Sequence, residues 1–347
     1  MTAIGTSGVE PAAVNTPIFS IILPVYNTRD LVEAAIRSAL DQSETDIEVI
    51  VIDDGSTDDS AAICERLMQE DTRLRLFRKS NEGQGIGRNL GLAYATGRYL
   101  LFLDSDDIML PGLLARVRAE FEDTAADVVC FGLAFRDIHD RPVATRAVRH
   151  RMIQEGPAIF EDAMLDRNFL TAPWSKAYRR DLIEAHGIRF PALRAFEDAM
   201  FGRHVAFHAK RAVYIKDILY HALTRAGSTS RALSTRNFET AAELIAEERR
   251  LFERLIGPGY DGALFGAHVV RFFAHLLILA AFRIPEREQR QACLMIAESC
   301  GFSQYASRAD VRRFLSWRTR LQVAVARRPT VGRFAARQAQ RLGITPY

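Results

Sequence analysis

Cysteine and long apolar runs are scarce in this chain of 347 residues. Its four cysteines, at positions 64, 130, 293 and 300, form no C-x-x-C pair and no metal-binding spacing. We therefore expect free thiols in a reducing compartment, not a disulfide framework or a zinc site. The N-terminus lacks the basic-then-apolar order of a secretion signal. The most apolar stretch, 272–282, is shorter than a membrane span. These features predict a cytoplasmic protein.

Acidic residues are missing from the C-terminal tail. Residues 311–347 contain nine arginines and no Asp or Glu, so the remainder carries a net charge of −6 within the total of +3. Apolar residues interleave with these arginines, and basic amphipathic helices with aromatic anchors lie on anionic membranes. The tail thus predicts a peripheral membrane contact. The alternative is a helical tail packed on the rest of the chain or on a partner. Nucleic acid is disfavoured because the acidic remainder should repel phosphates.

The first hundred residues alternate between strand and helix patterns. After a polar leader at 1–17, short apolar runs at 19–23, 47–52, 74–77 and 99–103 predict strands. Helical spacing of apolar residues lies between them, and Gly97 is expected to end the third helix. Alternation of this kind predicts an α/β fold with a mostly parallel sheet covered on both faces. Such sheets bind ligands beyond the carboxyl ends of their strands.

Polar residues follow three of these predicted strands. Asp104, Asp106 and Asp107 come directly after the fourth strand, in the sequence FLDSDD. Crowded carboxylates repel one another unless a cation holds them, and hard oxygen ligands suit Mg²⁺ or Mn²⁺ carrying a diphosphate. An acid pair alone is more typical of a solvated turn. The coincidence with Pro24 and Tyr26 after the first strand, and with Asp53 and Asp54 after the second, favours a ligand site.

These motifs, in this order, resemble the nucleotide-sugar-binding half of a family 2 glycosyltransferase with a GT-A fold. The resemblance covers residues 18–112 and rests on FSIILPVYN, VIVIDDGSTDDS, NEGQGIGRN and LLFLDSDD. It implies an inverting transfer of a sugar, of the hexosyltransferase type, from a nucleotide diphosphate to an acceptor hydroxyl. Among the donor-site residues Tyr26 would stack on the base, and Asp54 would accept a hydrogen bond from uracil N3–H. Arg88 would steady the aspartates or contact the nucleotide.

The resemblance also divides roles among the acids. Asp106 would be the main ligand of Mn²⁺ or Mg²⁺, and Asp104 would reach the ribose or a metal-bound water. Asp107 would bond backbone, and Asp53 would orient its loop or cap the next helix. The cation would neutralise charge that develops on the leaving diphosphate.

The second half of the chain resembles the family's acceptor half. Asp198, in the motif FED, matches the general base, and Glu197 is its neighbour. The alternative is an acid pair that stabilises a helix N-terminus. Trp174 and Lys176, in WSKAYR, would bind the acceptor. His221 and Arg225 belong to a segment that in relatives closes over the diphosphate. The Gln-x-x-Arg-Trp motif of processive members is missing, which indicates single additions.

The predicted organisation has three parts. A leader at 1–17 precedes a catalytic domain at 18–232, divided at 112/113 into donor and acceptor halves; a helical region at 233–347 ends in the basic tail at 311–347. We expect a metal-dependent, UDP-sugar-using enzyme of cell-surface polysaccharide or glycolipid synthesis. A nucleotide-sugar-binding scaffold without catalysis is an alternative. A nucleotidyltransferase is less favoured, because no Gly-rich basic loop follows the first strand, and the glycine spacing at 83–87 excludes a dehydrogenase.

Overall fold

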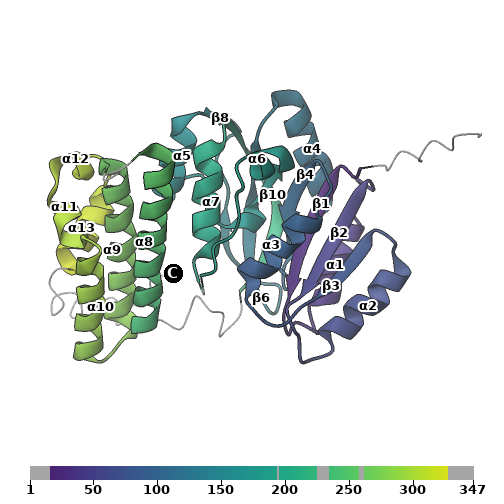
Figure 1. Cartoon of the computed structure of the whole chain (residues 1–347), viewed down its shortest axis with the longest axis horizontal. Coiled ribbons are helices and arrows are strands. Elements are labelled where there is room, and N and C mark those ends of the chain that lie inside the picture. Colours follow the sequence, from purple (N-terminus) through teal and green to yellow (C-terminus); the bar gives the residue numbers. More distant parts are fainter. Residues whose placement is uncertain (1–15, 194, 225–233, 258–261, 327–347) are drawn as a thin grey trace, which may run out of the picture.

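The structure, a computed structural model, describes residues 16–193, 195–224, 234–257 and 262–326. It has two parts, seen side by side in Figure 1: an α/β part built around one mixed sheet, and a set of C-terminal helices. This confirms the predicted α/β fold with a helical C-terminal region. Helix α7 (Glu197–His208) lies between the sheet and these C-terminal helices.

The first half of the sheet has the predicted parallel arrangement. Its strands are β1 (Phe19–Val25), β2 (Ile47–Asp53), β3 (Leu74–Arg78) and β4 (Tyr99–Phe102), in the spatial order β3-β2-β1-β4. All three pairings are parallel. Alternate side chains of β1 enter different cores, with Ile21 and Leu23 on one face and Ile22 on the other. Both faces are therefore buried, which explains why the strand is a continuous apolar run.

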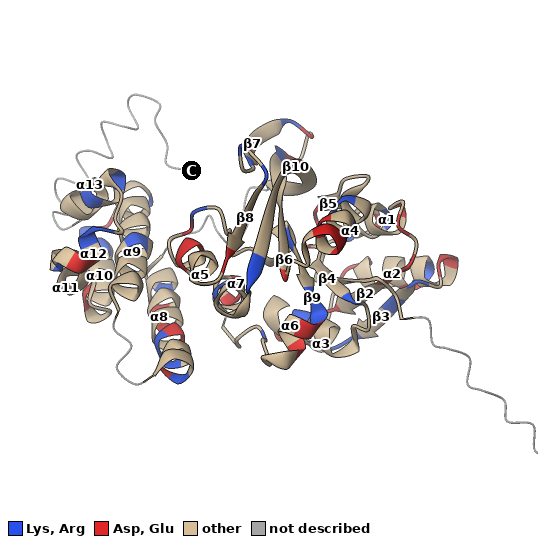
Figure 2. Cartoon of the chain, turned by 90° about the horizontal axis from the view of Figure 1, so that it is seen from above, with Lys and Arg blue, Asp and Glu red and all other residues tan. Residues whose placement is uncertain are grey.

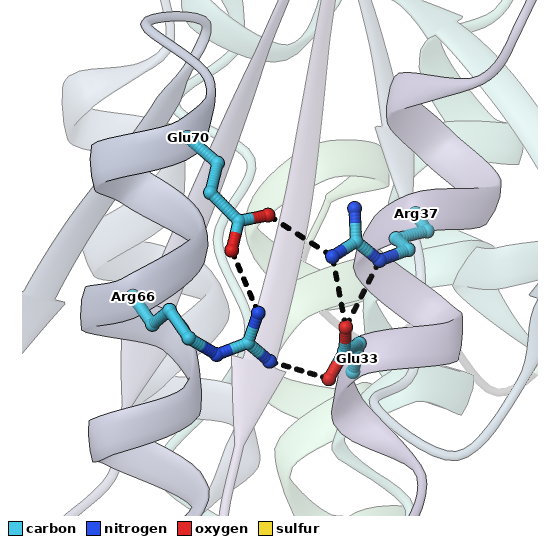
Figure 3. A network of polar contacts seen from close by, with 4 residues as sticks. All are labelled: Glu33, Arg37, Arg66 and Glu70. Atoms are coloured by element: carbon cyan, nitrogen blue, oxygen red, sulfur yellow. Dashed lines mark hydrogen bonds and ion pairs between the residues drawn. The ribbon is translucent and has the colours of Figure 1, made fainter.

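Helices cover the two faces of this half in different sets. Helices α1 (Val32–Leu40), α2 (Ser60–Glu70) and α4 (Leu113–Thr124) contribute to one core, and α3 (Gln84–Tyr94) contributes to the other. Helices α1 and α2 are also joined at the surface by a network of ion pairs in which each arginine contacts both carboxylates (Figure 3). Its members are Glu33 and Arg37 of α1 and Arg66 and Glu70 of α2. This network ties together the two helices that follow the first two strands.

The second half of the sheet differs from the mostly parallel prediction. Strand β9 (Lys176–Arg179) runs antiparallel to both β4 and β6 (Val128–Asp137). Strand β10 (Arg211–Thr224) returns parallel to β6 and pairs antiparallel with β5 (Ile108–Met109) and β8 (Met152–Glu155), while β7 (Pro142–Arg146) pairs antiparallel with β6. The sheet is thus mixed. Between β8 and β9 the chain forms α5 (Pro157–Met164) and a 3₁₀ turn, η1 (Pro173–Ser175), and it then enters the sheet in the direction opposite to β4 and β6.

Two glycines show how closely the chain passes itself near the first strands. Gly55, after β2, has a positive φ of 74°, a conformation that glycine adopts without strain. Gly97 does not end α3, which stops at Tyr94. A Cβ at Gly97 would instead lie 2.5 Å from the backbone nitrogen of Ser20, so glycine is required where β4 approaches β1.

The C-terminal helices form their own core. They are α8 (Thr235–Ile256), α9 (Ala263–Arg283), α10 (Arg287–Ser299), α11 (Phe302–Ser307), α12 (Ala309–Arg312) and α13 (Trp317–Ala326). This helical module also packs on α5 (Pro157–Met164), whose Phe160 and Met164 belong to the same core. A short α6 (Arg180–Ala185) lies on the sheet side. Packing between the two parts therefore begins before the predicted boundary at 233.

Helix α9 corrects one expectation drawn from the sequence. Among the described residues it alone is long and apolar enough to cross a membrane by length and composition, although the sequence seemed to offer no such segment. Most of that apolar window is buried inside the protein, against α11, α12 and α13 among others. This agrees with the expectation that 265–282 is a buried helix.

The beginning of the basic tail packs on α9, and its outer surface stays exposed. Val311, Leu315 and Val323 are buried in the module core. Trp317 and Leu321, four residues apart on α13, remain 71% and 57% exposed. In Figure 2, α13, whose ribbon carries blue segments for its arginines, lies at the opposite end of the molecule from β2 and β3. The rest of the basic tail, 327–347, lies outside the described residues.

Candidate active site

The candidate active site lies at the carboxyl edge of the parallel strands. After β1 the chain forms β2 and β3 on one side and then returns to form β4 on the other side of β1. Such a reversal of strand order opens a crevice beyond the strand ends. Pro24, Tyr26, Asp53, Asp54 and Asp104 all lie at or just after these ends, as the sequence predicts.

Asp54 organises the loop that follows β3. Its Oδ1 accepts hydrogen bonds from the Lys79 ammonium and from the Glu82 N–H, at 3.0 Å for the latter. Its Oδ2 accepts the Gly83 N–H at 2.9 Å. The Asp54 side chain is almost fully buried. A carboxylate oxygen has two acceptor positions, so Oδ2 retains one for a ligand donor.

Asp53 has a more local role, as one of its two predicted alternatives stated. Its Oδ1 accepts the Ser56 N–H at 3.1 Å, and its Oδ2 accepts Arg78 Nε at 3.3 Å. It is fully buried at the end of β2. Asp53 therefore orients the loop that carries Gly55.

Tyr26 is exposed at the mouth of the crevice. It follows β1, is 47% exposed, and precedes Asn27, whose φ of 51° turns the chain sharply. Asn27 Oδ1 accepts the Thr57 N–H at 2.8 Å, which fixes the first loop to the second. The exposed ring of Tyr26 is thus presented next to the Asp53–Asp54 loop. Pro24 is buried within β1 and opposite Ile52.

Three carboxylates after β4 concentrate negative charge. Burial, and then the charges of Asp104 and Asp106, raise the pKa of Asp107 well above its ordinary value. The Tyr220 hydroxyl donates to Asp107 at 2.8 Å, and the Leu223 N–H donates to it at 2.7 Å. Asp107 therefore holds β10 in place, while Asp104 and Asp106 stay partly exposed. This surplus of negative charge on oxygen ligands fits a hard divalent cation.

Arg88 joins the two halves of the site. It is only 2% exposed; its Nη2 donates to Asp104 at 2.8 Å and its Nη1 to Glu197 at 3.3 Å. The guanidinium also lies over the ring of Phe190. Burial disfavours its charge, yet Asp104 and Glu197 more than offset this and raise the pKa of Arg88. The guanidinium thus fixes the distance between the acids after β4 and the base motif.

Glu197 and Asp198 begin α7, which a strained turn precedes. Phe196 has a left-handed φ of 65°, an uncommon conformation for a bulky residue that often marks functional sites. Burial, and then the charge of Asp198, raises the pKa of Glu197. Burial likewise raises the pKa of Asp198, although Arg88 opposes this. A raised carboxyl pKa suits a general base near neutral pH.

The two residues predicted to bind the acceptor occupy different environments. Trp174 is partly buried and stacks on Tyr220, with ring centroids 5.3 Å apart. Tyr220, whose hydroxyl donates to Asp107, thus lies between Trp174 and that carboxylate. Lys176 is 1% exposed and donates to the Ala172 carbonyl at 2.6 Å and to Ser175 Oγ at 2.9 Å. Burial lowers its pKa to about 8. Direct acceptor contact by Lys176 would require it to leave these internal partners.

The remaining predicted contacts involve β10 and the segment after it. The charged neighbours of His221 are Arg136 and Asp140, and burial lowers the pKa of His221. Its neighbour Tyr220 is the residue that reaches the acids, accepting the Asp104 N–H at 3.2 Å as well as donating to Asp107. Adjacent residues of a strand point to opposite faces of the sheet. From this rule alone the sequence could have shown that either Tyr220 or His221, but not both, contacts the acids. Arg225 lies outside the described residues.

Sequence reasoning missed two further partners of the acids. Gln84 Nε2 donates to Asp104 at 3.0 Å, and Lys79 pairs with Asp54. Both come from the loop before α3 or from its first residue. The sequence offers a weak signal, since Gln84 lies within the Gly-rich stretch at 83–87 and Lys79 shortly precedes it.

The chain is similar to known proteins in sequence and in fold. The family model of glycosyl transferase family 2 matches residues 20–187. The chain is 31% identical over 236 residues to EpsH of Bacillus subtilis (strain 168), named as a glycosyltransferase, covering 66% of this chain and 67% of that protein. The crystal structure of S. aureus TarS 1-349 in complex with UDP-GlcNAc superposes with a TM-score of 0.71 at 22% identity, covering 95% of this chain and 93% of that 1-349 chain. A mannosyltransferase from Pyrobaculum calidifontis, in complex with GDP-Man and Mn²⁺, gives 0.51 at 18% identity, with coverages of 92% and 87%.

Proposed function

The chain belongs to the family 2 glycosyltransferases, and we propose that it moves a sugar from a UDP-sugar to an acceptor hydroxyl with inversion at the anomeric carbon. The observation that carries this is the Arg88 bridge. One buried guanidinium bonds both Asp104, beside the donor crevice, and Glu197, beside the proposed base. Residues 109 positions apart in the chain thus meet where donor and acceptor must meet.

The base of the nucleotide is the first determinant of the donor. The remaining acceptor position on Asp54 Oδ2 suits the N3–H of uracil, and the exposed ring of Tyr26 can stack on the base. Cytosine and adenine have no N–H donor at the matching position, and thymine has the same one as uracil. The complex of TarS with UDP-GlcNAc supports a UDP-sugar.

A divalent cation, Mn²⁺ or Mg²⁺, fits the acids that follow β4. Asp106 would hold it, with Asp104 close by, and the cation would neutralise charge on the leaving diphosphate. No group of three or more metal-type ligands occurs among the described residues. Magnesium is commonly held by one or two carboxylates together with substrate phosphates. The Mn²⁺ in the Pyrobaculum complex supports this proposal.

Asp198 is the proposed general base. It would take the proton of the acceptor hydroxyl as the new C–O bond forms, and the leaving nucleoside diphosphate departs from the opposite face of the sugar. Glu197 would keep Arg88 in place, because it is the carboxylate bonded to that guanidinium. Tyr220 would keep the acids in place, and Trp174, stacked on Tyr220, would offer its remaining surface to the acceptor.

The acceptor is proposed to belong to a cell-surface polysaccharide or glycolipid, reached from the cytoplasmic side of the membrane. The support is the exposed pair Trp317 and Leu321 on α13, with Arg318 and Arg320 exposed beside them. Aromatic and aliphatic side chains among arginines bind anionic lipid surfaces. A flotation assay with vesicles of anionic and of zwitterionic lipid tests this, since only the anionic vesicles should carry the protein with them.

The catalytic proposal is tested by separating chemistry from donor binding. Asp198→Asn should lower the transfer rate by about 10²–10⁴-fold, as expected for loss of a general base, while leaving the affinity for UDP unchanged. Asp123→Asn, at an exposed position on α4, is the matched control and should keep full activity. An Asp198→Asn enzyme that transfers sugar at the wild-type rate would refute the assignment of the base.

A further inference from the structure

A buried ionic cluster connects α7 to the helical module. Glu248 of α8 is fully buried; its Oε1 accepts Arg203 Nη1 of α7 at 2.5 Å, and its Oε2 lies 2.9 Å from His268 Nε2 of α9. His268 is also fully buried, and Arg203 is 2% exposed. Asp166, after α5, lies 3.5 Å from the other Nη of Arg203. Four segments thus meet at one set of charges.

Burying these charged groups costs hydration free energy, so the cluster is a poor way to stabilise the fold. Charged groups that are removed from water lose their hydration free energy. Their mutual attraction offsets this loss only when the geometry of the contact is good. Two buried nitrogens, Arg203 Nε and His268 Nδ1, have no hydrogen-bond partner in the part of the chain that is described. Burial opposes ionisation of Glu248, yet Arg203 and His268 lower its pKa to about 2. A directional contact of this kind specifies an arrangement more than it adds stability.

The helical module touches α7 at a second point, beside the base. The ring of Phe196 packs edge-on against Phe272 of α9, with centroids 5.3 Å apart. Phe196 is the residue with the left-handed φ directly before Glu197. Phe196 and Arg203 are seven residues apart, or about 10 Å along a helix axis. Two contacts at this separation fix both the rotation and the translation of α7.

We propose that the helical module is a positioning device for the base, with Glu248 and Phe272 as the positioning residues that act through α7. This inference rests on the proposed function, because it takes Asp198 as the group being positioned. It assigns a role to a region in which the sequence offers no catalytic residue. In the described part of the chain, the side chains of Arg203 and Glu248 bond each other, Asp166 and His268, and none of these residues lies on β1, β2 or β4, so donor binding should not depend on this cluster.

The charges around Asp198 come from several elements. Arg88 of α3, Asp104 after β4, and Lys176 and Tyr178 of β9 face it, together with Glu197 and Arg203 of α7 itself. A small displacement of α7 changes the distance of Asp198 from all of them and from the acceptor hydroxyl. Misplacement by about 1 Å can cost about 10²-fold in rate.

The test uses the full-length protein and the variants Glu248→Gln and Phe272→Leu. Gln keeps the size of the side chain and removes its charge, and Leu keeps an apolar contact without the ring edge. Each should lower kcat by about 10-fold or more, with the KM for the donor and the affinity for UDP within about twofold of wild type. Glu120→Gln is the matched control, because Glu120 is also buried and paired with arginines, but these are Arg116 of α4 and Arg151 just before β8, not residues of α7. It should keep kcat even if it lowers the melting temperature.

Hydrogen–deuterium exchange supplies a readout that does not need activity. Both variants should exchange faster than wild type at 197–203, while 47–57 in the donor half stays unchanged. A wild-type kcat in Glu248→Gln and Phe272→Leu, or unchanged exchange in α7, would overturn the inference. A wild-type protein that binds UDP but transfers no sugar would instead refute the proposed function, and the exchange measurement would still decide the positioning role. If Glu248→Gln fails to fold, Phe272→Leu carries both measurements.

Discussion

Replacing Arg88 by Met should weaken both the fold and the chemistry, in a way that depends on pH. The change removes the cation shared by Asp104 and Glu197, whose side chains are 19% and 13% exposed. Breaking a buried ion pair typically costs 3–5 kcal/mol. Because both carboxylates retain some solvent, we expect a loss near the lower end, about 3 kcal/mol of unfolding free energy at pH 8.

The pH dependence gives this prediction its sign. Arg88 lowers the pKa of Glu197 and of Asp198, which burial has already raised. Without Arg88 both pKa values rise further. The penalty for burying the charged carboxylates is present at pH values above those pKa values and disappears as acid protonates the groups. The deficit of Arg88→Met should therefore shrink between pH 8 and pH 5, and the acid limb of its activity profile should move to higher pH.

Urea unfolding at pH 5 and pH 8 measures the deficit directly. Arg118→Met is a suitable control, since Arg118 pairs with Glu44 and Glu122 on the surface and should matter little. An equal deficit at both pH values, or no deficit at all, would show that Arg88 does not hold the two carboxylates together as the structure indicates.

Three further predictions concern individual contacts. Lys176→Met should be more stable than wild type at pH 7, by up to about 3 kcal/mol less the contribution of the hydrogen bonds lost. Burial lowers the pKa of Lys176 from its ordinary 10.5 to about 8, so the buried ammonium carries a penalty below pH 8. That advantage should fade between pH 8 and 10.5 in unfolding experiments, and a constant difference would contradict the buried charge. Tyr220→Phe removes the hydroxyl that donates to Asp107 and accepts the Asp104 N–H, so that Asp107 keeps only the Leu223 N–H of these two donors. This should cost about 1–3 kcal/mol; calorimetry that finds no change would exclude this contact. Glu33→Gln should lower the melting temperature slightly at low salt and not at 1 M NaCl, where charges are screened, whereas a loss that persists at high salt would mean that the network in Figure 3 acts by packing.

The strand ends of the donor half could be predicted from the sequence because they depend on local pattern. The apolar runs that form β1, β2 and β4 are bounded by polar residues, and parallel strands necessarily bring those residues to one edge. Tyr26, Asp54 and Asp104 follow from this rule alone. The helical region predicted at 233–347 contains α8 and α9.

Contacts between distant segments could not be predicted in the same way. The direction of β9 depends on the path of the loops before it, and the partners of Lys176 lie in its own preceding turn. The cluster of Arg203, Glu248 and His268 joins three helices whose relative rotation no single helix pattern specifies. Arg88 was a candidate because it lies next to the glycines at 83–87. Its bond to Glu197 joins residues 109 positions apart and depends on the tertiary structure.

The central claim is that the edge of the sheet binds a uridine nucleotide with a divalent cation. It is tested most directly by the thermal stability of the protein with UDP, GDP or ADP, in Mn²⁺, Mg²⁺ or EDTA. We predict that UDP stabilises the protein more than GDP or ADP and only with metal, by about 2.7 kcal/mol at a hundredfold excess over Kd. Asp106→Ala should lose this stabilisation while folding normally. Equal stabilisation by UDP in EDTA, or none with any nucleotide, would contradict the account.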